Sequence, residues 1–144
     1  AIRELGELHM WQLAIKPGKP FGWGKNGQCL VIMLPGNSVS AYATFYILAY
    51  PAMKKMMGLN PSLPQMMATI NFTSERIQPR REFLRGNYYQ DEKGDYIVDG
   101  VEFQGSAMLS GLSYANCLIE MKENQPTHKG DRVRIYPLPK EVAK

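Results

Sequence analysis

The sequence predicts an α/β unit followed by a small all-β unit. Residues 1–62 combine continuous apolar runs of strand length with one long apolar helix pattern. Residues 63–144 instead carry short β-like runs that Gly, Pro, Asp or Asn turns separate. Between them "GLNPSLPQ", residues 58–65, holds two prolines and one glycine, which is typical of a linker or a sharp turn. We therefore predict two domains, residues 1–62 and residues 63–144.

The bulk composition limits the class of protein. The chain has 144 residues, of which 44% are hydrophobic and 21% are charged, as expected of a globular protein and not of a disordered one. No apolar run reaches the roughly 18 residues that span a bilayer. The start, "AIRELGELHM", has neither the basic end nor the apolar centre of a signal peptide. We expect a cytoplasmic protein without a membrane partner.

The first unit is predicted to place strands and turns before a helix. "IRELGELH", residues 2–9, predicts a helical tail with Gly6 as its C-cap. "MWQLAI", residues 10–15, and "CLVIML", residues 29–34, predict strands, and the continuous apolar run of the second indicates cover on both faces. This order fits the second half of a three-layer α/β domain with a parallel sheet.

A helix is predicted to follow the second strand. "VSAYATFYILAY", residues 39–50, is apolar nearly all round, which favours a buried helix that ends at Pro51. Pro51 can open another short helix, "PAMKKMM", which Gly58 closes.

The second unit is predicted to be a small β-barrel or sandwich, because brief β-like runs recur at regular spacing. The runs are "MMATINF", "REFLRGNYY", "YIVDGVEF", "ANCLIEM" and "DRVRIYPL". "GSAMLSGLSY", residues 105–114, is the exception and predicts one short helical turn.

The positive charge is unevenly distributed between the two predicted units. Residues 1–62 carry six Lys/Arg against two Asp/Glu, and residues 63–144 carry eleven of each, so the whole excess of +4 lies in the first unit. An anionic partner fits there, although Lys54 and Lys55 can equally form a solvated face.

Cys29 and Cys117 lie within apolar runs without CxxC spacing, so we expect reduced core residues and not metal ligands.

The turn "PGNS" predicts an anion site at a helix start. Asn37 or Ser38 is a good N-cap, and the first helical turn contains Ser40 but no Asp or Glu that would neutralise the helix dipole. Free backbone N–H groups at such a position, including those near Gly36, attract anions. The alternative is that the turn only caps the helix.

The turn "KPGKP" predicts two cations near that helix start. Proline follows both Lys16 and Lys19 and biases each backbone toward extended geometry. In a parallel sheet this turn would share its edge with "PGNS", and two facing cations would repel one another unless an anion joined them. The alternative is a solvated turn in which lysine is only a polar filler.

These motifs carry a family resemblance. "IKPGKPFGWG", "LPGNSVSAYATFY" and "PAMKKMMG", followed by "RREFLRG", "QGSAMLSGLSYANCLI" and "GDRVRIYPL", resemble the MoeA/gephyrin family of molybdopterin molybdenumtransferases. The resemblance covers essentially the whole chain, in order. One departure is Ser38, where the family usually has proline, and its loss is expected to loosen the turn slightly.

The resemblance implies a fold and an activity. It implies a partial, MogA-like three-layer α/β domain followed by the family's C-terminal β-barrel, and hence a C-terminal fragment that is inactive alone. Family members insert molybdate into adenylylated molybdopterin, which gives molybdenum cofactor and AMP, with a divalent cation assisting. The Mg²⁺ ligands are expected mostly outside this chain, with no metal site in it, and the full-length protein is expected to be a homodimer.

The resemblance also implies the site residues. Two lysines would bind molybdate or the pterin's phosphate, backbone amides and one hydroxyl would hold phosphate or pterin edges, and two residues of the second unit would close the pocket. No nucleophile is implied, and no catalytic residue is assigned. In chain order the residues are Lys16, Lys19, Gly36, Asn37, Ser40, Arg85 and Ser106. Taken alone, Arg85 could form a surface salt bridge with Glu82 or Glu102.

Two other functions are weighed. A gephyrin-like scaffold that binds an anion or a partner without catalysis stays open. A barrel for single-stranded nucleic acid could stack bases on Tyr88, Tyr89 and Tyr96. The zero net charge of the second unit argues against it, so no nucleic-acid partner is expected.

Overall fold

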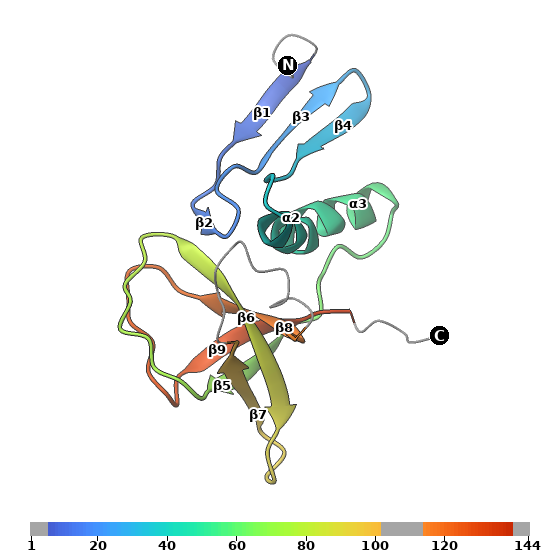
Figure 1. Cartoon of the computed structure of the whole chain (residues 1–144). Coiled ribbons are helices and arrows are strands. Elements are labelled where there is room, and N and C mark those ends of the chain that lie inside the picture. The colour runs from blue at the N-terminus through green and yellow to red at the C-terminus, as the bar shows by residue number, and fades with distance from the viewer. Residues whose placement is uncertain (1–5, 102–113, 140–144) are drawn as a thin grey trace. The chain divides into compact units, whose positions relative to one another are not determined.

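A computed structural model describes residues 6–101 and 114–139 (Figure 1). The chain divides into two compact units, Ala1–Ser62 and Leu63–Lys144, and each is described by itself below. Within the described ranges no helix has both the length and the apolar character needed to cross a membrane. The short helical turn expected at residues 105–114 falls almost entirely outside these ranges.

The first unit contains a three-stranded sheet with strand order β1-β3-β4. Both pairings are antiparallel. The strands are β1 (Glu7–Trp11), β3 (Gly22–Asn26) and β4 (Cys29–Met33). The expected parallel sheet is therefore wrong. The reason is local: only Gly27 and Gln28 separate β3 from β4, and Gly27 has a φ of 59°, which suits a two-residue hairpin.

Residues 7–9 form a strand and not the helical tail that the sequence predicted. Glu7 pairs with Lys25 across the sheet, and the His9 ring stacks on Trp23 with centroids 4.7 Å apart. Gly6 approaches the Lys25 carbonyl so closely that a Cβ would collide with it, so this glycine serves strand packing and not a helix cap.

The strand predicted at residues 10–15 is interrupted. Its first residues belong to β1, its last belongs to β2 (Ile15–Lys16), and Gln12 between them has a φ of 70°. The strand predicted at residues 29–34 is present as β4, but only half-buried, and Cys29 at its start is exposed. Cover on both faces and a core position for Cys29 were therefore wrong.

The helices form one continuous segment with a change of winding. They are α2 (Ser38–Thr44), the π-helical turn η1 (Phe45–Ala49) and α3 (Tyr50–Met56). Pro51 lies in the first turn of α3, and Gly58, with a φ of 75°, donates its N–H to Lys55 O at 3.1 Å after the helix ends. The predicted Gly58 stop is confirmed. Leu48 and Ala52 line an apolar hollow of about 290 Å³ together with side chains of the sheet.

The second unit is a closed five-stranded barrel, and the predicted β-barrel is confirmed. Its strand order is β6-β7-β5-β9-β8, and β6 also pairs with β8 to close the ring. All neighbours are antiparallel except the parallel pair β5–β7. The strands are β5 (Met66–Ile70), β6 (Arg81–Gln90), β7 (Tyr96–Gly100), β8 (Cys117–Met121) and β9 (Arg132–Pro137).

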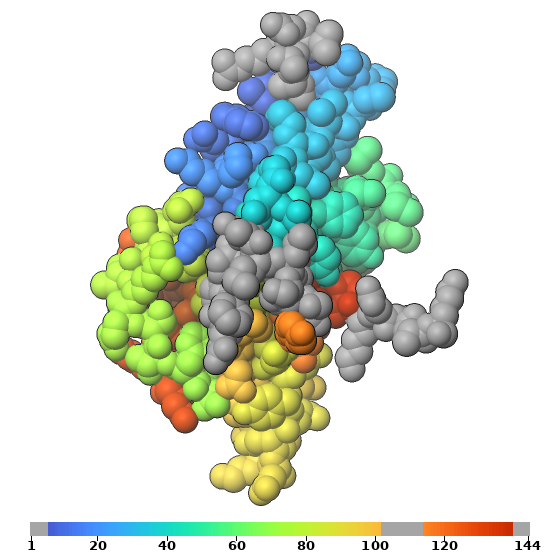
Figure 2. All heavy atoms as spheres, in the orientation of Figure 1, coloured from blue at the N-terminus to red at the C-terminus, as the bar shows by residue number. Residues whose placement is uncertain are grey.

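The barrel encloses an apolar core. Its fully buried members come from every strand except β6, which contributes the half-buried Leu84 and Tyr88. The central residues are Ala68, Ile70, Val98, Cys117, Ile119 and Ile135. Figures 1 and 2 show the β6–β7 hairpin (yellow) projecting from the rest of this unit.

Candidate anion-binding site

The KPGKP turn has a defined, hydrogen-bonded backbone. The Phe21 N–H donates to Gly18 O at 3.1 Å, and the Leu13 N–H donates to Lys19 O at 3.0 Å. Gly18 is buried and has a φ of 122°, a conformation that only glycine adopts without strain. The turn therefore holds both of its lysines on a fixed main chain.

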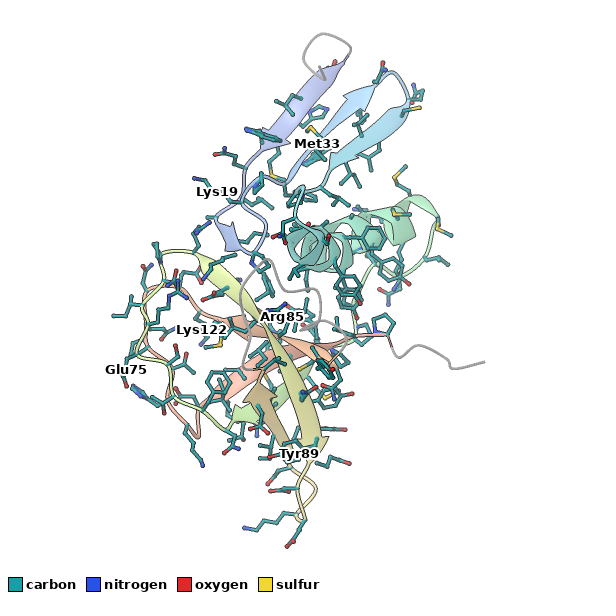
Figure 3. The ribbon with its side chains drawn as sticks, in the orientation of Figure 1. Lys19, Met33, Glu75, Arg85, Tyr89 and Lys122 are labelled. Atoms are coloured by element: carbon teal, nitrogen blue, oxygen red, sulfur yellow. The ribbon has the colours of Figure 1, made fainter. Side chains whose placement is uncertain are left out.

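The two lysines differ in exposure. Lys16 is half-buried at the end of β2, and the Lys16–Pro17 peptide bond is cis. Lys19 is exposed on the loop between β2 and β3 (Figure 3). An exposed ammonium group on a rigid loop can reach a ligand at little cost in backbone entropy.

The helix start is capped by its own asparagine. Asn37 Oδ1 accepts the backbone N–H groups of Val39 at 3.1 Å and Ser40 at 3.2 Å, and also the Ser40 hydroxyl at 3.4 Å. Asn37 is thus the N-cap, as predicted. The expectation of free amides does not hold for Val39 and Ser40, because the cap already occupies them. Gly36 is exposed just before the cap.

A glycine–threonine contact brings the turn to the helix. A Cβ at Gly18 would collide with the Thr44 methyl group. Thr44 is 1% exposed, and its hydroxyl donates to Ser40 O at 2.7 Å. The KPGKP turn therefore packs against α2 one helical turn beyond Ser40. Sequence reasoning expected the turn to share the edge of a parallel sheet with "PGNS", whereas the described contact of Gly18 is with Thr44, the last residue of α2.

The sequence around these residues contains basic side chains but few acidic ones. No Asp or Glu occurs in the sequence between Glu7 and Glu75, and the first turn of α2 has no acidic residue. Glu7 itself lies 3.6 Å from His9 Nε2. Neither the turn with its lysines nor the start of α2 therefore has an acidic sequence neighbour, which favours an anionic ligand at each.

Arg85 belongs to the second unit and is deeply buried there. It lies on β6 opposite Leu118 of β8 and is only 2% exposed (Figure 3). Burial lowers the pKa of its guanidinium. Arg85 is therefore not a surface residue, whereas its pairing with Glu82 or Glu102 stays a prediction. Glu102 and Ser106, the other candidates in this part of the sequence, lie outside the described residues.

The nucleic-acid alternative loses two of its three stacking residues. Tyr88 and Tyr96 pack edge to face, with ring centroids 6.0 Å apart, against the barrel core. Tyr89 alone of the three is exposed, at 44%. A single exposed ring does not form the row of platforms that single-stranded binding needs.

No metal centre is evident in residues 6–101 and 114–139. No group of three or more His, Cys, Asp or Glu side chains there is placed to hold a metal ion. The family resemblance placed the Mg²⁺ ligands mostly outside this chain, which stays a prediction, and no step below is routed through the ion.

Comparisons with known proteins agree on one family. Residues 68–138 match the family model described as "MoeA C-terminal region (domain IV)". The molybdopterin molybdenumtransferase of Haemophilus influenzae is 36% identical over 139 residues, which cover 94% of this chain and 34% of that protein. Molybdopterin molybdenumtransferase 1 of Mycobacterium tuberculosis is 29% identical, over 82% of this chain and 29% of that protein.

A solved structure shows the same fold. The crystal structure of the molybdopterin biosynthesis moeA protein from Pyrococcus horikoshii OT3 superposes with a TM-score of 0.74 at 29% identity. The match covers 91% of this chain and 32% of that one. The chain belongs to the MoeA family, in the C-terminal region of its members. It spans about a third of the length of the relatives it matches.

Proposed function

We propose that this chain serves in molybdenum cofactor biosynthesis, as the oxyanion-binding part of a molybdopterin molybdenumtransferase. The observation that carries the proposal is the packing of Gly18 on Thr44. This contact packs the turn that carries Lys16 and Lys19 against Thr44, the last residue of α2, and the sequence has no Asp or Glu between Glu7 and Glu75. The names of the relatives supply the class of substrate.

Each residue of the first unit has a role in the proposal. Lys16 and Lys19 bind molybdate or the phosphate of molybdopterin through charge-assisted hydrogen bonds. The backbone near Gly36 and Asn37 receives the same ligand from the helix side, where the dipole favours negative charge. Ser40 holds the Asn37 side chain in position and does not bind the ligand itself, because its hydroxyl already donates a hydrogen bond to Asn37 Oδ1.

The second unit contributes residues of the same chemistry. We propose that Arg85 also binds an oxyanion, because an arginine fork matches two oxygens of a tetrahedral group. Ser106 has the same role by resemblance alone. A buried guanidinium acts strongly on an anion, since little water competes with it.

The mechanism rests on charge. Both substrates are anions, and bringing molybdate to phosphorylated molybdopterin costs electrostatic repulsion. Fixed cations and helix amides offset that repulsion and hold the reactants together. The finer predictions are adenylylated molybdopterin as the substrate, AMP as a product, Mg²⁺, a homodimeric full-length protein and a cytoplasmic location.

Molybdate binding tests the proposal directly. Isothermal titration with molybdate should show a saturable site, and Lys19→Ala should weaken it about tenfold, the equivalent of one charge-assisted contact. Lys25→Ala is the matched control, because Lys25 is an exposed lysine on β3 and its removal makes the same change in net charge. Equal losses in both variants would show that only the net charge matters and would overturn the proposed site.

A further inference from the structure

Three methionines lie in and just after the last turn of α3. Met53, Met56 and Met57 belong to the stretch "MKKMM", so the later two follow the first by three and four positions. Residues at these spacings are neighbours on one face of a helix, about 5–6 Å apart at Cβ. The three residues are 43%, 65% and 70% exposed, in chain order. They therefore share one solvent-exposed face.

The backbone that carries these side chains is fixed. The Met57 N–H donates to Met53 O at 3.0 Å, so the helical hydrogen bonding continues to Met57. The Leu59 N–H donates to Lys54 O at 2.8 Å around Gly58, which has a φ of 75°. Together with the Gly58 hydrogen bond described above, this forms a Schellman motif. The helical spacing of the three methionines is thus held at both ends.

The two lysines of the stretch are not placed on the methionine face. Lys54 Nζ donates to Ser62 O at 3.0 Å and lies 5.7 Å from the centroid of the Tyr50 ring. Lys55 follows Met53 by two positions, which places it on another side of the helix. The methionine face can therefore accept a further cation, and the negative end of the helix dipole favours one in the last turn.

The available donor atoms select the kind of ion. Residues 38–62 contain no His, Cys, Asp or Glu. Thioether sulfur is a soft, uncharged ligand that suits Cu(I), whereas Zn²⁺, Mg²⁺ and Ca²⁺ prefer thiolate, imidazole or oxygen ligands. Methionine is unbranched and rotates freely when exposed, so neighbouring sulfurs can turn toward one ion.

We propose that Met53, Met56 and Met57 bind one Cu(I) ion through their three thioether sulfurs. The step is coordination alone: no electron is transferred, and no proton is released because a thioether carries none. Ag(I) has the same charge and is also soft, so it should occupy the same site. This site shares no residue with the proposed molybdate site and does not rest on that function.

Nuclear magnetic resonance of the methionine methyl groups in the whole chain tests the site. Silver nitrate is titrated in chloride-free buffer into the Cys29→Ser variant, because the exposed thiol of Cys29 would otherwise compete for the ion. Saturable shifts with one ion per chain are expected at the ε-methyl groups of Met53, Met56 and Met57. Zinc sulfate should leave these groups unshifted, since Zn²⁺ does not favour thioethers.

Substitution by leucine shows whether the three sulfurs act together. Leucine keeps the volume and the helix propensity of methionine but removes the ligand atom. Met53→Leu, Met56→Leu and Met57→Leu, each in the Cys29→Ser background, should weaken Ag(I) binding about tenfold or more, as one of three ligands is lost. Unchanged affinity in any of the three would overturn the three-sulfur site.

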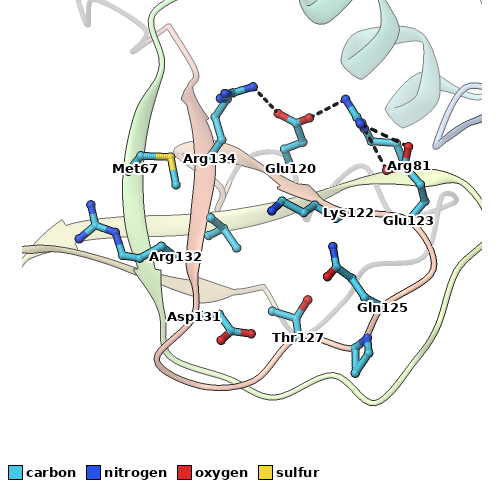
Figure 4. Close-up of a pocket in the computed structure, with 12 residues that line it drawn as sticks. Met67, Arg81, Glu120, Lys122, Glu123, Gln125, Thr127, Asp131, Arg132 and Arg134 are labelled. Carbon is cyan, nitrogen blue, oxygen red and sulfur yellow. Dashed lines mark hydrogen bonds and ion pairs between the residues drawn. The ribbon is translucent and has the colours of Figure 1, made fainter.

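Met67→Leu is the matched control. Met67 is 43% exposed, as Met53 is, but it lies on strand β5 of the barrel. It borders a hollow of about 640 Å³, and none of the other described residues that line this hollow contains sulfur (Figure 4). Its substitution should leave Ag(I) binding unchanged. Equal weakening in all four variants, or non-saturating shifts of every exposed methionine alike, would also overturn the site.

Discussion

Gly18 shows how one residue can determine whether a site exists. Its positive φ and its contact with Thr44 leave no room for a side chain. The sequence identified "PGKP" as a turn from its composition alone, but it could not reveal that the glycine is the point of contact with a helix some twenty-five residues later.

Replacing Gly18 tests this role at the residue scale. Gly18→Ala should destabilise the first unit by about 2–4 kcal/mol, from backbone strain and from the collision with Thr44. Gly27→Ala is the control, because Gly27 also has a positive φ but nothing lies within 4 Å of an added Cβ. It should cost only about 1–2 kcal/mol. Urea unfolding measures both, and a control variant as unstable as Gly18→Ala would contradict the contact.

Tyr136 makes the barrel sensitive to alkali. Burial, and then the hydrogen bond to Glu120, raise the pKa of Tyr136 above its usual 10.0. A raised pKa means that the folded state favours the neutral phenol, so this stabilisation is present below pH 10 and is lost as pH rises through the folded-state pKa.

The difference between wild type and Tyr136→Phe isolates that effect. The difference between the urea midpoints of the two proteins should stay constant below about pH 9 and shrink as pH rises above about 10, because phenylalanine has no proton to lose. Lysine titration affects both proteins and cancels in the comparison. A constant difference up to about pH 11 would show that the pKa of Tyr136 is the same in the folded and unfolded states and would contradict the raised value.

At the scale of elements, local sequence patterns predicted where the helices and strands lie more accurately than they predicted how the strands pair. Asn37 was predicted as a cap because capping depends on neighbours two and three residues away. The strand at residues 22–26 was missed because two of its five residues are glycine. Parallel pairing was wrong because the two-residue turn at Gly27, and not the apolar pattern, fixes the direction of β4.

The π-helical turn is a second feature that the apolar pattern did not specify. The sequence predicted one helix that stops at Pro51 and a second that starts there, whereas the structure has one continuous helical segment to Met56. The wider winding of residues 45–49 adds one residue per turn, which keeps Phe45 and Tyr50 on one face with rings 6.3 Å apart. Pro51 is tolerated because it lies in the first turn of the next helix.

Strand β8 and strand β4 give the two cysteines opposite reactivity. Cys117 is buried in the barrel, and burial raises the pKa of its thiol to about 12. Cys29 is exposed at the start of β4. A thiol reagent such as Ellman's should therefore label Cys29 rapidly in the native chain and Cys117 only after unfolding. The Cys29→Ser variant provides the control, and fast labelling of that variant would contradict the buried position of Cys117.

At the scale of the whole molecule, five short β-like runs predicted a barrel or a sandwich, and the family resemblance selected the barrel, but neither predicted its strand order. The parallel neighbours β5 and β7 are separated in the sequence by the whole of β6, and no local sequence pattern predicts such a pairing. Turn and cap patterns indicated Lys16, Lys19 and the helix start near Asn37 as an anion site, and the family resemblance added Arg85, Ser106 and the identity of the ligand. Composition indicated only an anionic partner, because a cation on a loop has the same local pattern whether or not it binds a ligand.

The catalytic capacity of the chain is a prediction at this scale. The chain spans about a third of the length of its relatives and has no metal-binding cluster in its described residues. We expect it to bind molybdate but to make no molybdenum cofactor when supplied with adenylylated molybdopterin and Mg²⁺. A reconstitution assay that reports active cofactor measures this, with a full-length relative as the positive control. Product formation by the chain alone would refute the expectation.

The ten residues of β6 have a consequence for assembly. One part of this strand joins β7, which follows it directly, and another part joins β8, so that Gly86 faces both Gly100 and Cys117. The β6–β7 pairing is a hairpin, which can form quickly because its contacts are local. The β6–β8 pairing forms more slowly, because it requires closure of a loop of about thirty residues. The ring is complete only with β9 as well, because β9 pairs with both β5 and β8. A nascent chain that lacked residues 132–137 would leave strand edges of β5 and β8 unpaired and open to aggregation, so the last strand of the barrel protects all the others.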